Sequence, residues 1–168
     1  MANTKRMVTD ALFAAIALLL FMVEAQIPPV VPIPGIKLGL ANIMTLTALH
    51  IFGKRDAAAV LSVRIIIGAV LAGNASTFVF SSAGAILCFL TLCLLHRFFT
   101  VPIWVQSVFG AIAHNTGQLL VAAVWMHTKS VFWYLPFLLL AAILSGCFTG
   151  LSAQYFIRFL QKKGVSIS

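Results

Sequence analysis

The chain has 168 residues, of which 62% are hydrophobic and only 8% are charged, and its net charge is +8. A water-soluble domain of this length cannot bury so much apolar surface, so the composition excludes a soluble fold and predicts a single all-α membrane domain over residues 1–168. The three cysteines, Cys88, Cys93 and Cys147, all lie in apolar runs, which argues against a disulfide framework or a zinc site.

Six apolar stretches are predicted to cross the membrane as helices, each close to the roughly 20 residues that a bilayer requires. The first has no cleavable signal pattern and is expected to remain as a span. The proline-rich residues 28–36 separate the first two stretches, and the sixth is longer than a bilayer needs. In chain order, the predicted spans are residues 9–27, 37–53, 56–73, 79–97, 103–126 and 131–158.

Basic residues between the predicted spans fall mostly on one side of the membrane. If the N-terminus is inside, eight of them lie in cytoplasmic segments, whereas only Lys37 and Lys129 lie outside. Because cytoplasmic loops carry the excess of Lys and Arg, this asymmetry predicts that both termini are cytoplasmic. Topology therefore explains the positive charge, and no nucleic-acid partner is expected. The eight residues are Lys5, Arg6, Lys54, Arg55, Arg97, Arg158, Lys162 and Lys163.

Polar residues within the spans gather in the outer half of the predicted bundle. Arg64 lies near the middle of the third span, where a cation normally faces the bundle interior or a cavity and has a partner. Six further polar residues come from the first, second and fifth spans, while the inner half is nearly free of them. This bias predicts a pocket of cationic character that opens to the outside. The predicted pocket residues are Glu24, Lys37, Asn42, Arg64, His114, Asn115 and Gln118.

Structural roles compete with ligand binding at these positions. Arg64 and Glu24 would form a structural ion pair, and Lys37 would extend to the membrane interface. The polar residues of the fifth span would form hydrogen bonds between helices. Glu24 would equally serve as a proton-linked group, although one carboxylate supports no mechanism. The joint clustering favours a pocket more strongly than any single member does.

Small residues at four-residue spacing mark two of the predicted spans. Ala11 and Ala15 lie in the inner half of the first span, and Gly146 and Gly150 form a G-x-x-x-G pattern in the sixth. Such stripes let helices approach closely in lipid, where packing drives helix association. They predict close helix contacts along both stripes.

Several catalytic chemistries have no support in the sequence. Prenyl transfer needs clustered aspartates that hold magnesium against a diphosphate, and the chain has only three acidic residues. A Walker-type loop and redox cofactor motifs are also missing. His50 and His96, like the other two histidines, are expected on different spans or loops and on opposite sides, which disfavours a metal site. The sequence predicts no enzyme, no metal and no cofactor.

Three segments carry a family resemblance. The stretches "PIPGIKLGLANIMTL", "GKRDAAAVLSVRIIIGAVLAG" and "GAIAHNTGQLLVAA" resemble the family named heptaprenyl diphosphate synthase component I, also called the Gx transporter family. The resemblance runs from Thr9 to about Ser152, and the segments keep their order. This family is grouped with the substrate-binding S components of energy-coupling factor (ECF) transporters.

The resemblance implies a six-helix S-component fold in a bacterial cell membrane, with both termini cytoplasmic. It implies a ligand in the outer half of the bundle, capped by residues 28–36. It also implies that an A-x-x-x-A motif, here Ala11 and Ala15, packs on a transmembrane coupling subunit driven by two ATPases. The leading hypothesis is therefore a substrate-binding subunit of an ECF-type importer for a small metabolite or vitamin-like molecule. Lys37 and Arg64 would face an anionic or electron-rich part of this ligand.

Two alternatives remain open. Members of the family also resemble a membrane component of flavin-based extracellular electron transfer, which implies a quinone or flavin head group in the same pocket. The other alternative is a non-catalytic accessory to prenyl diphosphate metabolism, with a diphosphate at Lys37 and Arg64. The family's enzyme-style name is not expected to describe catalysis by this chain, since the aspartate-rich site of a prenyl synthase is missing.

Overall fold

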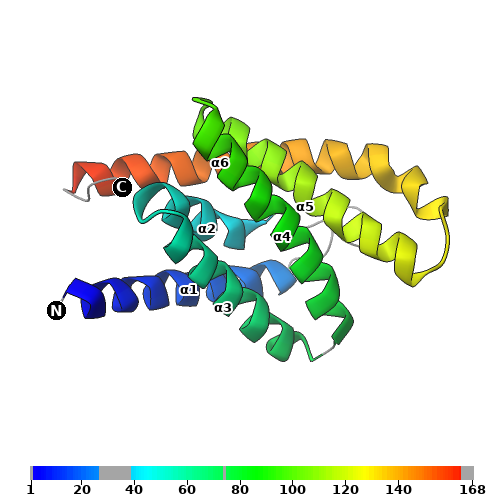
Figure 1. Cartoon of the computed structure of the whole chain (residues 1–168), viewed down its shortest axis with the longest axis horizontal. Coiled ribbons are helices and arrows are strands. Elements are labelled where there is room, and N and C mark those ends of the chain that lie inside the picture. Colours follow the sequence, from blue (N-terminus) through cyan, green and yellow to red (C-terminus); the bar gives the residue numbers. More distant parts are fainter. Residues whose placement is uncertain (1, 27–38, 74, 164–168) are drawn as a thin grey trace.

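The computed structural model of the protein describes residues 2–26, 39–73 and 75–163. These residues form α-helices and one short 3₁₀ helix, with no strand among them (Figure 1). In chain order the elements are α1 (Ala2–Gln26), α2 (Leu40–Ile51), α3 (Lys54–Ala72), α4 (Ala75–Phe98), α5 (Ile103–Trp125), η1 (Ser130–Tyr134) and α6 (Leu135–Lys162).

Each predicted span coincides with one of the six α-helices, with differences at the ends. The first helix begins at Ala2, well before the predicted span. The second begins at Leu40 rather than at residue 37, directly after Gly39, whose φ of 73° is a left-handed conformation that favours glycine. The sixth predicted span divides into η1 and α6, and a proline stands in the first turn of α6. Lys37 and the predicted capping loop, residues 28–36, lie outside the described residues.

Four of the helical segments are long and apolar enough to cross a membrane, which makes this a membrane protein. The other two helices differ from the prediction of six spans for separate reasons. Helix α2 has 12 residues, or about 18 Å at 1.5 Å per residue, which is less than a bilayer's hydrocarbon thickness. Helix α3 has 19 residues but carries Lys54, Arg55 and Asp56 in its first turn and Arg64 in its middle. The four segments are Thr4–Gln26, Phe78–Phe98, Ile103–Trp125 and Ser130–Lys162.

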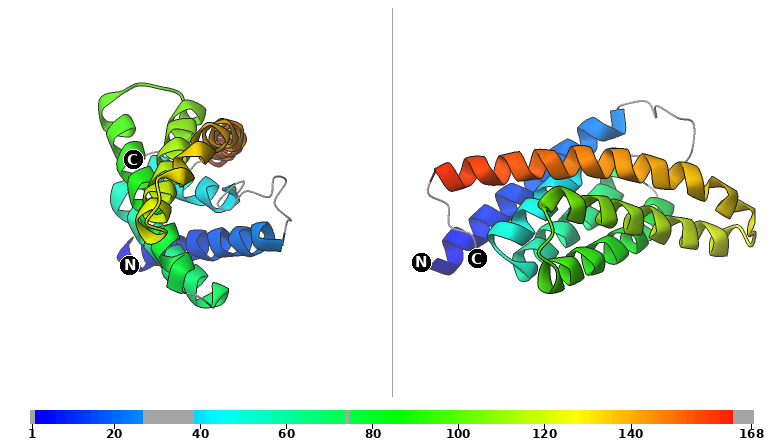
Figure 2. Two further views of the ribbon diagram at one scale, coloured as in Figure 1. Left: turned by 90° about the vertical axis from the view of Figure 1, so that its right-hand side faces the viewer. Right: turned by 90° about the horizontal axis from the view of Figure 1, so that it is seen from above.

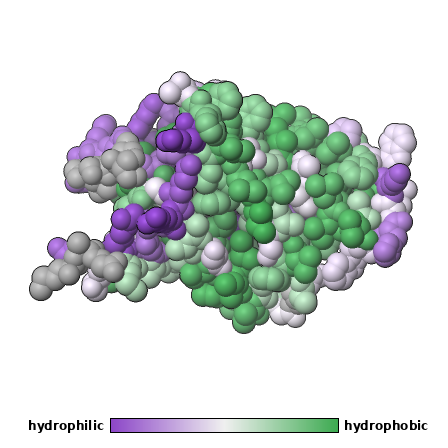
Figure 3. Space-filling model, viewed as in Figure 1, coloured by the Kyte–Doolittle hydropathy of each residue, from purple (hydrophilic) through white to green (hydrophobic). Residues whose placement is uncertain are grey.

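The helices form a bundle in which the start of α1 and the end of α6 lie at the same end of the molecule (Figures 1 and 2). Helix α5 packs between α4 and α6, while α1 packs on α2 and α3. Figure 3 shows an apolar band across the middle of the molecule, with polar residues gathered at the end where α1 begins. This distribution suits a membrane protein whose apolar middle lies in lipid and whose polar ends reach water.

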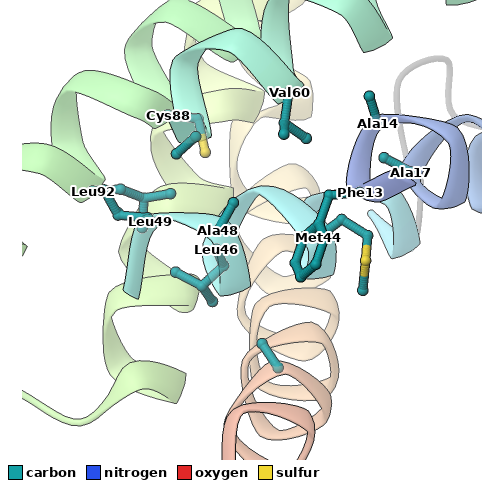
Figure 4. Close-up of a cluster of buried hydrophobic side chains, with 12 residues drawn as sticks. Phe13, Ala14, Ala17, Met44, Leu46, Ala48, Leu49, Val60, Cys88 and Leu92 are labelled. Atoms are coloured by element: carbon teal, nitrogen blue, oxygen red, sulfur yellow. The ribbon is translucent and has the colours of Figure 1, made fainter. Parts of the chain in front are cut away.

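The short helix α2 forms the centre of the apolar core. Nine of its 12 residues are buried, because α1, α3 and α6 pack around it. An apolar cluster surrounds it, with side chains from α1, α3, α4 and α6 (Figure 4). The members that Figure 4 labels are Phe13, Ala14, Ala17, Met44, Leu46, Ala48, Leu49, Val60, Cys88 and Leu92.

The glycines of the sixth helix confirm the predicted close contact. A Cβ atom added to Gly146 would lie 2.6 Å from the Cα of Val108, and one added to Gly150 would lie 2.5 Å from the Cα of Trp104. Such distances are too short for a side chain, so the backbones of α5 and α6 touch along this stripe. Beside it, the hydroxyl groups of Ser107 and Thr149 lie 2.9 Å apart and form a buried hydrogen bond.

Candidate functional site

A cavity of about 80 Å³ lies inside the bundle and is lined by residues of all six α-helices. Six of the seven residues predicted for a polar pocket line this cavity, and the seventh, Lys37, lies outside the described residues. The structure thus brings together side chains that are as far apart in the chain as residues 24 and 118. Their role in ligand binding remains a prediction. The six are Glu24, Asn42, Arg64, His114, Asn115 and Gln118.

Glu24 lies near the end of α1 and is bonded to the start of α2. Its Oε1 accepts a hydrogen bond from the backbone N–H of Gly39 (2.6 Å), and its Oε2 accepts one from the N–H of Leu40 (3.1 Å). The N-terminus of a helix has unpaired N–H donors and favours an anion, so Glu24 supplies to α2 the negative charge that its own sequence lacks. The side chain is buried at 8% exposure. Both carboxylate oxygens are therefore engaged within the fold.

Arg64 lies in the middle of α3 and reaches the same cavity. Glu24 and Cys88 are close enough to act on it electrostatically. Within the described residues, however, its guanidinium makes neither an ion pair nor a hydrogen bond. The structural ion pair between Arg64 and Glu24, one of the readings of the sequence, is therefore not formed, because the carboxylate is taken by the backbone of α2.

Asn115 combines a structural bond with a free acceptor. Its Nδ2 donates to the backbone carbonyl of Leu138 in α6, at 3.0 Å. Since a carbonyl can only accept, this bond orients the amide and directs Oδ1 away from Leu138. The prediction of interhelical hydrogen bonding is thus confirmed for the amide nitrogen of Asn115. Its oxygen makes no hydrogen bond within the described residues, and the residue also lines the cavity.

The cavity also contains polar residues that the sequence did not indicate. Ser81 lies near the start of α4, whereas Ser107, near the start of α5, forms a hydrogen bond with Thr149 of α6. Hydroxyl side chains in helices commonly bond to a carbonyl one turn earlier, as Thr149 does to Ser145, so they give little signal in a sequence. The sequence offered one hint, which is spacing: Ser107 lies three residues before Gly110, and Thr149 lies three residues after Gly146. The additional residues are Ser81, Ser107, Ser145 and Thr149.

The expectation that the histidines lie apart is wrong for one pair. The rings of His50, near the end of α2, and His96, in the last turn of α4, have centroids 4.8 Å apart. The two helices run in the same direction through the predicted bundle and end on the same side, which explains the contact. No group of three or more His, Cys, Asp or Glu side chains that could hold a metal ion is present in the described parts of the chain.

A second hollow, of about 400 Å³, lies on the outer surface between α1 and α3. Ala11, Ala14 and Ala15 all line it; Ala11 and Ala15 are exposed, whereas Ala14 is only 3% exposed and also belongs to the core. At one edge of the hollow lies Asp10, whose buried Oδ1 has no hydrogen-bond partner among the described residues. We refer to this surface as the α1–α3 groove.

An ion pair joins the same two helices near the start of each. Arg6 Nε donates to Asp56 Oδ2 at 2.8 Å, and a second nitrogen of the guanidinium contacts the same oxygen. Arg6 also donates to the backbone carbonyl of Phe52 at 3.0 Å. The first helix is thus held to its neighbours at both ends, by Arg6 at one end and by Glu24 at the other.

Comparisons with known proteins give one positive result. Searches against curated proteins and against solved structures return no match. The model of the family described as heptaprenyl diphosphate synthase component I matches residues 13–156, close to the stretch in which the resemblance was recognised. Since this match covers most of the chain, the protein belongs to the heptaprenyl diphosphate synthase component I family.

Proposed function

We propose that this protein is the substrate-binding membrane subunit of an ECF-type importer for a small metabolite or vitamin-like molecule. The observation that carries the proposal is the cavity inside the bundle, which collects polar side chains from helices that are otherwise apolar. Polar groups are expensive at membrane depth and are commonly functional there. A binding role gives one reason for all of them, whereas isolated structural bonds would not gather around a single space.

The α1–α3 groove supports the second half of the proposal, the docking of a coupling subunit. Ala11 and Ala15 present small side chains to a hollow that no helix among residues 2–26, 39–73 and 75–163 fills. Small residues of this kind let a second helix approach closely in lipid. The proposed partner is the transmembrane coupling subunit, which acts together with its two ATPases.

The proposed placement is the bacterial cell membrane, with both termini in the cytoplasm and all six α-helices in the lipid. The location of the start of α1 and the end of α6 at one end of the molecule supports this topology (Figure 2). The basic residues of the sequence agree with it. Helix α2 needs no full span of its own, because the surrounding helices bury most of it.

We also propose that the chain is not itself an enzyme, despite the name of its family. The only acidic side chain that lines the cavity in the described residues is Glu24, and both of its oxygens bind backbone N–H groups. This leaves no carboxylate to hold magnesium against a diphosphate there.

Mass spectrometry of small molecules retained through detergent purification tests the binding role. Gln118 lines the cavity, so the variant Gln118→Leu should lose the retained molecule. Gln161 is exposed near the end of α6, so Gln161→Leu is the matched control and should retain it. Lys37→Ala is expected to weaken retention as well. If neither the native protein nor the control retains or binds any small molecule, the proposal is wrong.

Co-purification tests the coupling role. The protein should be recovered in complex with the ECF coupling subunit when the two are produced together. A clean separation of the two proteins under conditions that preserve other ECF complexes would count against an importer.

The electron-transfer alternative keeps the same cavity but gives it a different occupant. Phe21, Leu46 and Ile65 give the cavity apolar walls, which would suit the ring of a quinone or flavin. A coloured, redox-active molecule in the purified protein would favour this alternative. A colourless metabolite without redox activity would exclude it.

A further inference from the structure

The two formal charges beside the cavity are opposite, but the side chains that carry them are not paired with each other. Among the described residues that line it, only Arg64 and Glu24 belong to the four amino-acid types that are charged at neutral pH. Their opposite signs would cancel if the two side chains were paired. They are not paired, because Glu24 already binds the N–H groups of Gly39 and Leu40. The negative charge of Glu24 therefore stabilises the positive N-terminal end of α2.

Arg64 makes no ion pair within the described residues, although Glu24 lies near enough to act on it electrostatically. A guanidinium has five N–H donors and does not lose its proton in proteins, so it cannot adapt by becoming neutral. Within the described residues it has neither an ion pair nor a hydrogen bond, although it lies midway along a helix of a membrane bundle. A cation in such a place is costly unless an anion or ordered water compensates it. The cavity in front of Arg64 has room for such a group.

Asn115 adds a second requirement on whatever occupies the cavity. One N–H of its Nδ2 is fixed on the carbonyl of Leu138, which leaves the second N–H and the acceptor Oδ1. A ligand group that complements Oδ1 must be an N–H or O–H donor. Arg64 offers only donors, so the two side chains ask for opposite partners.

We infer that the cavity takes an organic acid, which meets the guanidinium of Arg64 with a carboxylate or phosphate oxygen and the Oδ1 of Asn115 with an N–H or O–H group. This inference rests on the proposed function, because it names the class of the substrate that the importer binds. An acid in this position forms charge-assisted hydrogen bonds, often two in parallel. It also places an anion directly on the guanidinium of Arg64, whereas a neutral quinone would leave Arg64 without an ion pair.

The first test needs no knowledge of the ligand. Arg64→Met removes the charge and keeps a side chain of similar reach, and Arg158→Met makes the same change at an exposed site on α6. In protein stripped of small molecules, Arg64→Met should unfold in detergent at a higher temperature than the native protein, because an uncompensated cation is gone. Arg158→Met should leave the unfolding temperature nearly unchanged. A lower unfolding temperature for Arg64→Met would show that the fold supplies a counter-ion, and would overturn the inference.

The second test identifies the acid by its chemistry. Benzoate and phenyl phosphate serve as probes of the two anionic groups, and benzamide serves as the neutral counterpart, each measured by its shift of the unfolding temperature. Together with these probes, the molecules retained from cells are identified in the native protein and in both variants. An acid should be retained by the native protein and by Arg158→Met, and should be reduced at least tenfold in Arg64→Met. Stabilisation by benzoate or by phenyl phosphate, but not by benzamide, then assigns the anion as carboxylate or phosphate.

The contrary outcomes separate this inference from the proposed function. A neutral molecule retained equally by the native protein and Arg64→Met overturns the inference and leaves the binding role standing. If no molecule is retained and no probe, acidic or neutral, shifts the unfolding temperature, both the inference and the proposed function are wrong.

Discussion

Two helix pairs in this protein carry small residues at four-residue spacing, and they use them in opposite ways. In α5–α6, Gly146 and Gly150 lie against the backbone of α5, so the stripe is fully used within the chain. In α1–α3, Ala11 and Ala15 face an open groove of about 400 Å³. The same sequence pattern thus describes an internal contact in one place and an unfilled outer surface in the other.

The two pairs also differ in what holds them together. The α5–α6 pair is held along its length by backbone contact and by the hydrogen bond between Ser107 and Thr149. Helix α1 is bonded at its ends, by Arg6 to Asp56 and by Glu24 to the start of α2, and one face of its middle packs into the core. The comparison teaches that α1 can present its middle to a partner without losing its place in the bundle, whereas α5 and α6 cannot separate.

The largest expected effect is that of Gly150→Ala. The added Cβ would lie 2.5 Å from the Cα of Trp104, and because that atom belongs to the backbone it cannot move aside. We expect the free energy of unfolding in detergent to fall by about 3 kcal/mol, at the upper end of the cost of overpacking. Gly68→Ala is the matched control on α3, since its Cβ would meet only the ring of Phe21, at 3.4 Å. A comparable loss in both variants would mean that the two pairs are equally tight.

The fold was largely predictable because lipid imposes simple rules on a sequence. Helices are the way in which a single chain of this composition can satisfy its backbone in a bilayer, and apolar length then locates them. The start of α2 at Leu40 was less predictable, because it depends on the left-handed Gly39 and on a carboxylate from another helix. Because α2 begins only at Leu40, it is too short to cross a bilayer, although its residues are apolar.

The gathering of the site residues could be predicted, but their bonds could not. Depth along a helix follows from counting residues, which predicted Arg64, Asn115 and Gln118 in the same half of the bundle, and all three line the cavity. The sequence allowed Glu24 to pair with Arg64 or with backbone N–H groups, and only three-dimensional geometry decides between them. In the structure, Glu24 bonds to the N–H groups of Gly39 and Leu40. The serine and threonine lining, such as Ser107, was missed because hydroxyl groups occur on every face of a helix.

The second prediction concerns the hydrogen bonds that join Glu24, near the end of α1, to the start of α2. In Glu24→Gln, the carboxylate is replaced by an amide that keeps one acceptor oxygen and turns an NH₂ group toward the N–H groups of α2. We expect a loss of about 1–2 kcal/mol in the free energy of unfolding, from one charge-assisted bond and from the helix dipole. Gln26→Ala, an exposed change on the same helix, should have almost no effect. An unchanged stability of Glu24→Gln would show that the cap does not hold α1.

The third prediction concerns the hydrogen bond inside the α5–α6 pair. Thr149→Val removes the hydroxyl that lies 2.9 Å from Ser107 and keeps the shape of the side chain. We expect a loss of about 0.6 kcal/mol, the usual value for hydrogen bonds between membrane helices, and thus far less than for Gly150→Ala. Thr116→Val, on α5, is the control, because the Thr116 hydroxyl bonds only to the carbonyl of Ile112 in its own helix. The difference between the two variants isolates the contribution of the bond between helices. If the two variants lose the same stability, backbone packing alone holds the α5–α6 pair together.

The smallest expected effect on stability is that of Ala15→Leu, and it is the change that separates the two helix pairs most clearly. Ala15 is exposed in the α1–α3 groove, so a leucine there has space, and the free energy of unfolding should change by less than about 0.5 kcal/mol. The added side chain would nevertheless fill the surface on which a second helix is proposed to pack, so recovery of the coupling subunit should fall sharply. Ala25→Leu adds the same bulk to α1 outside the groove and should leave recovery intact. Because stability and association are predicted to respond independently, the variant distinguishes a groove kept open for a partner from a mere packing defect. Loss of stability together with association would place Ala15 in the same class as Gly150, as part of an internal contact.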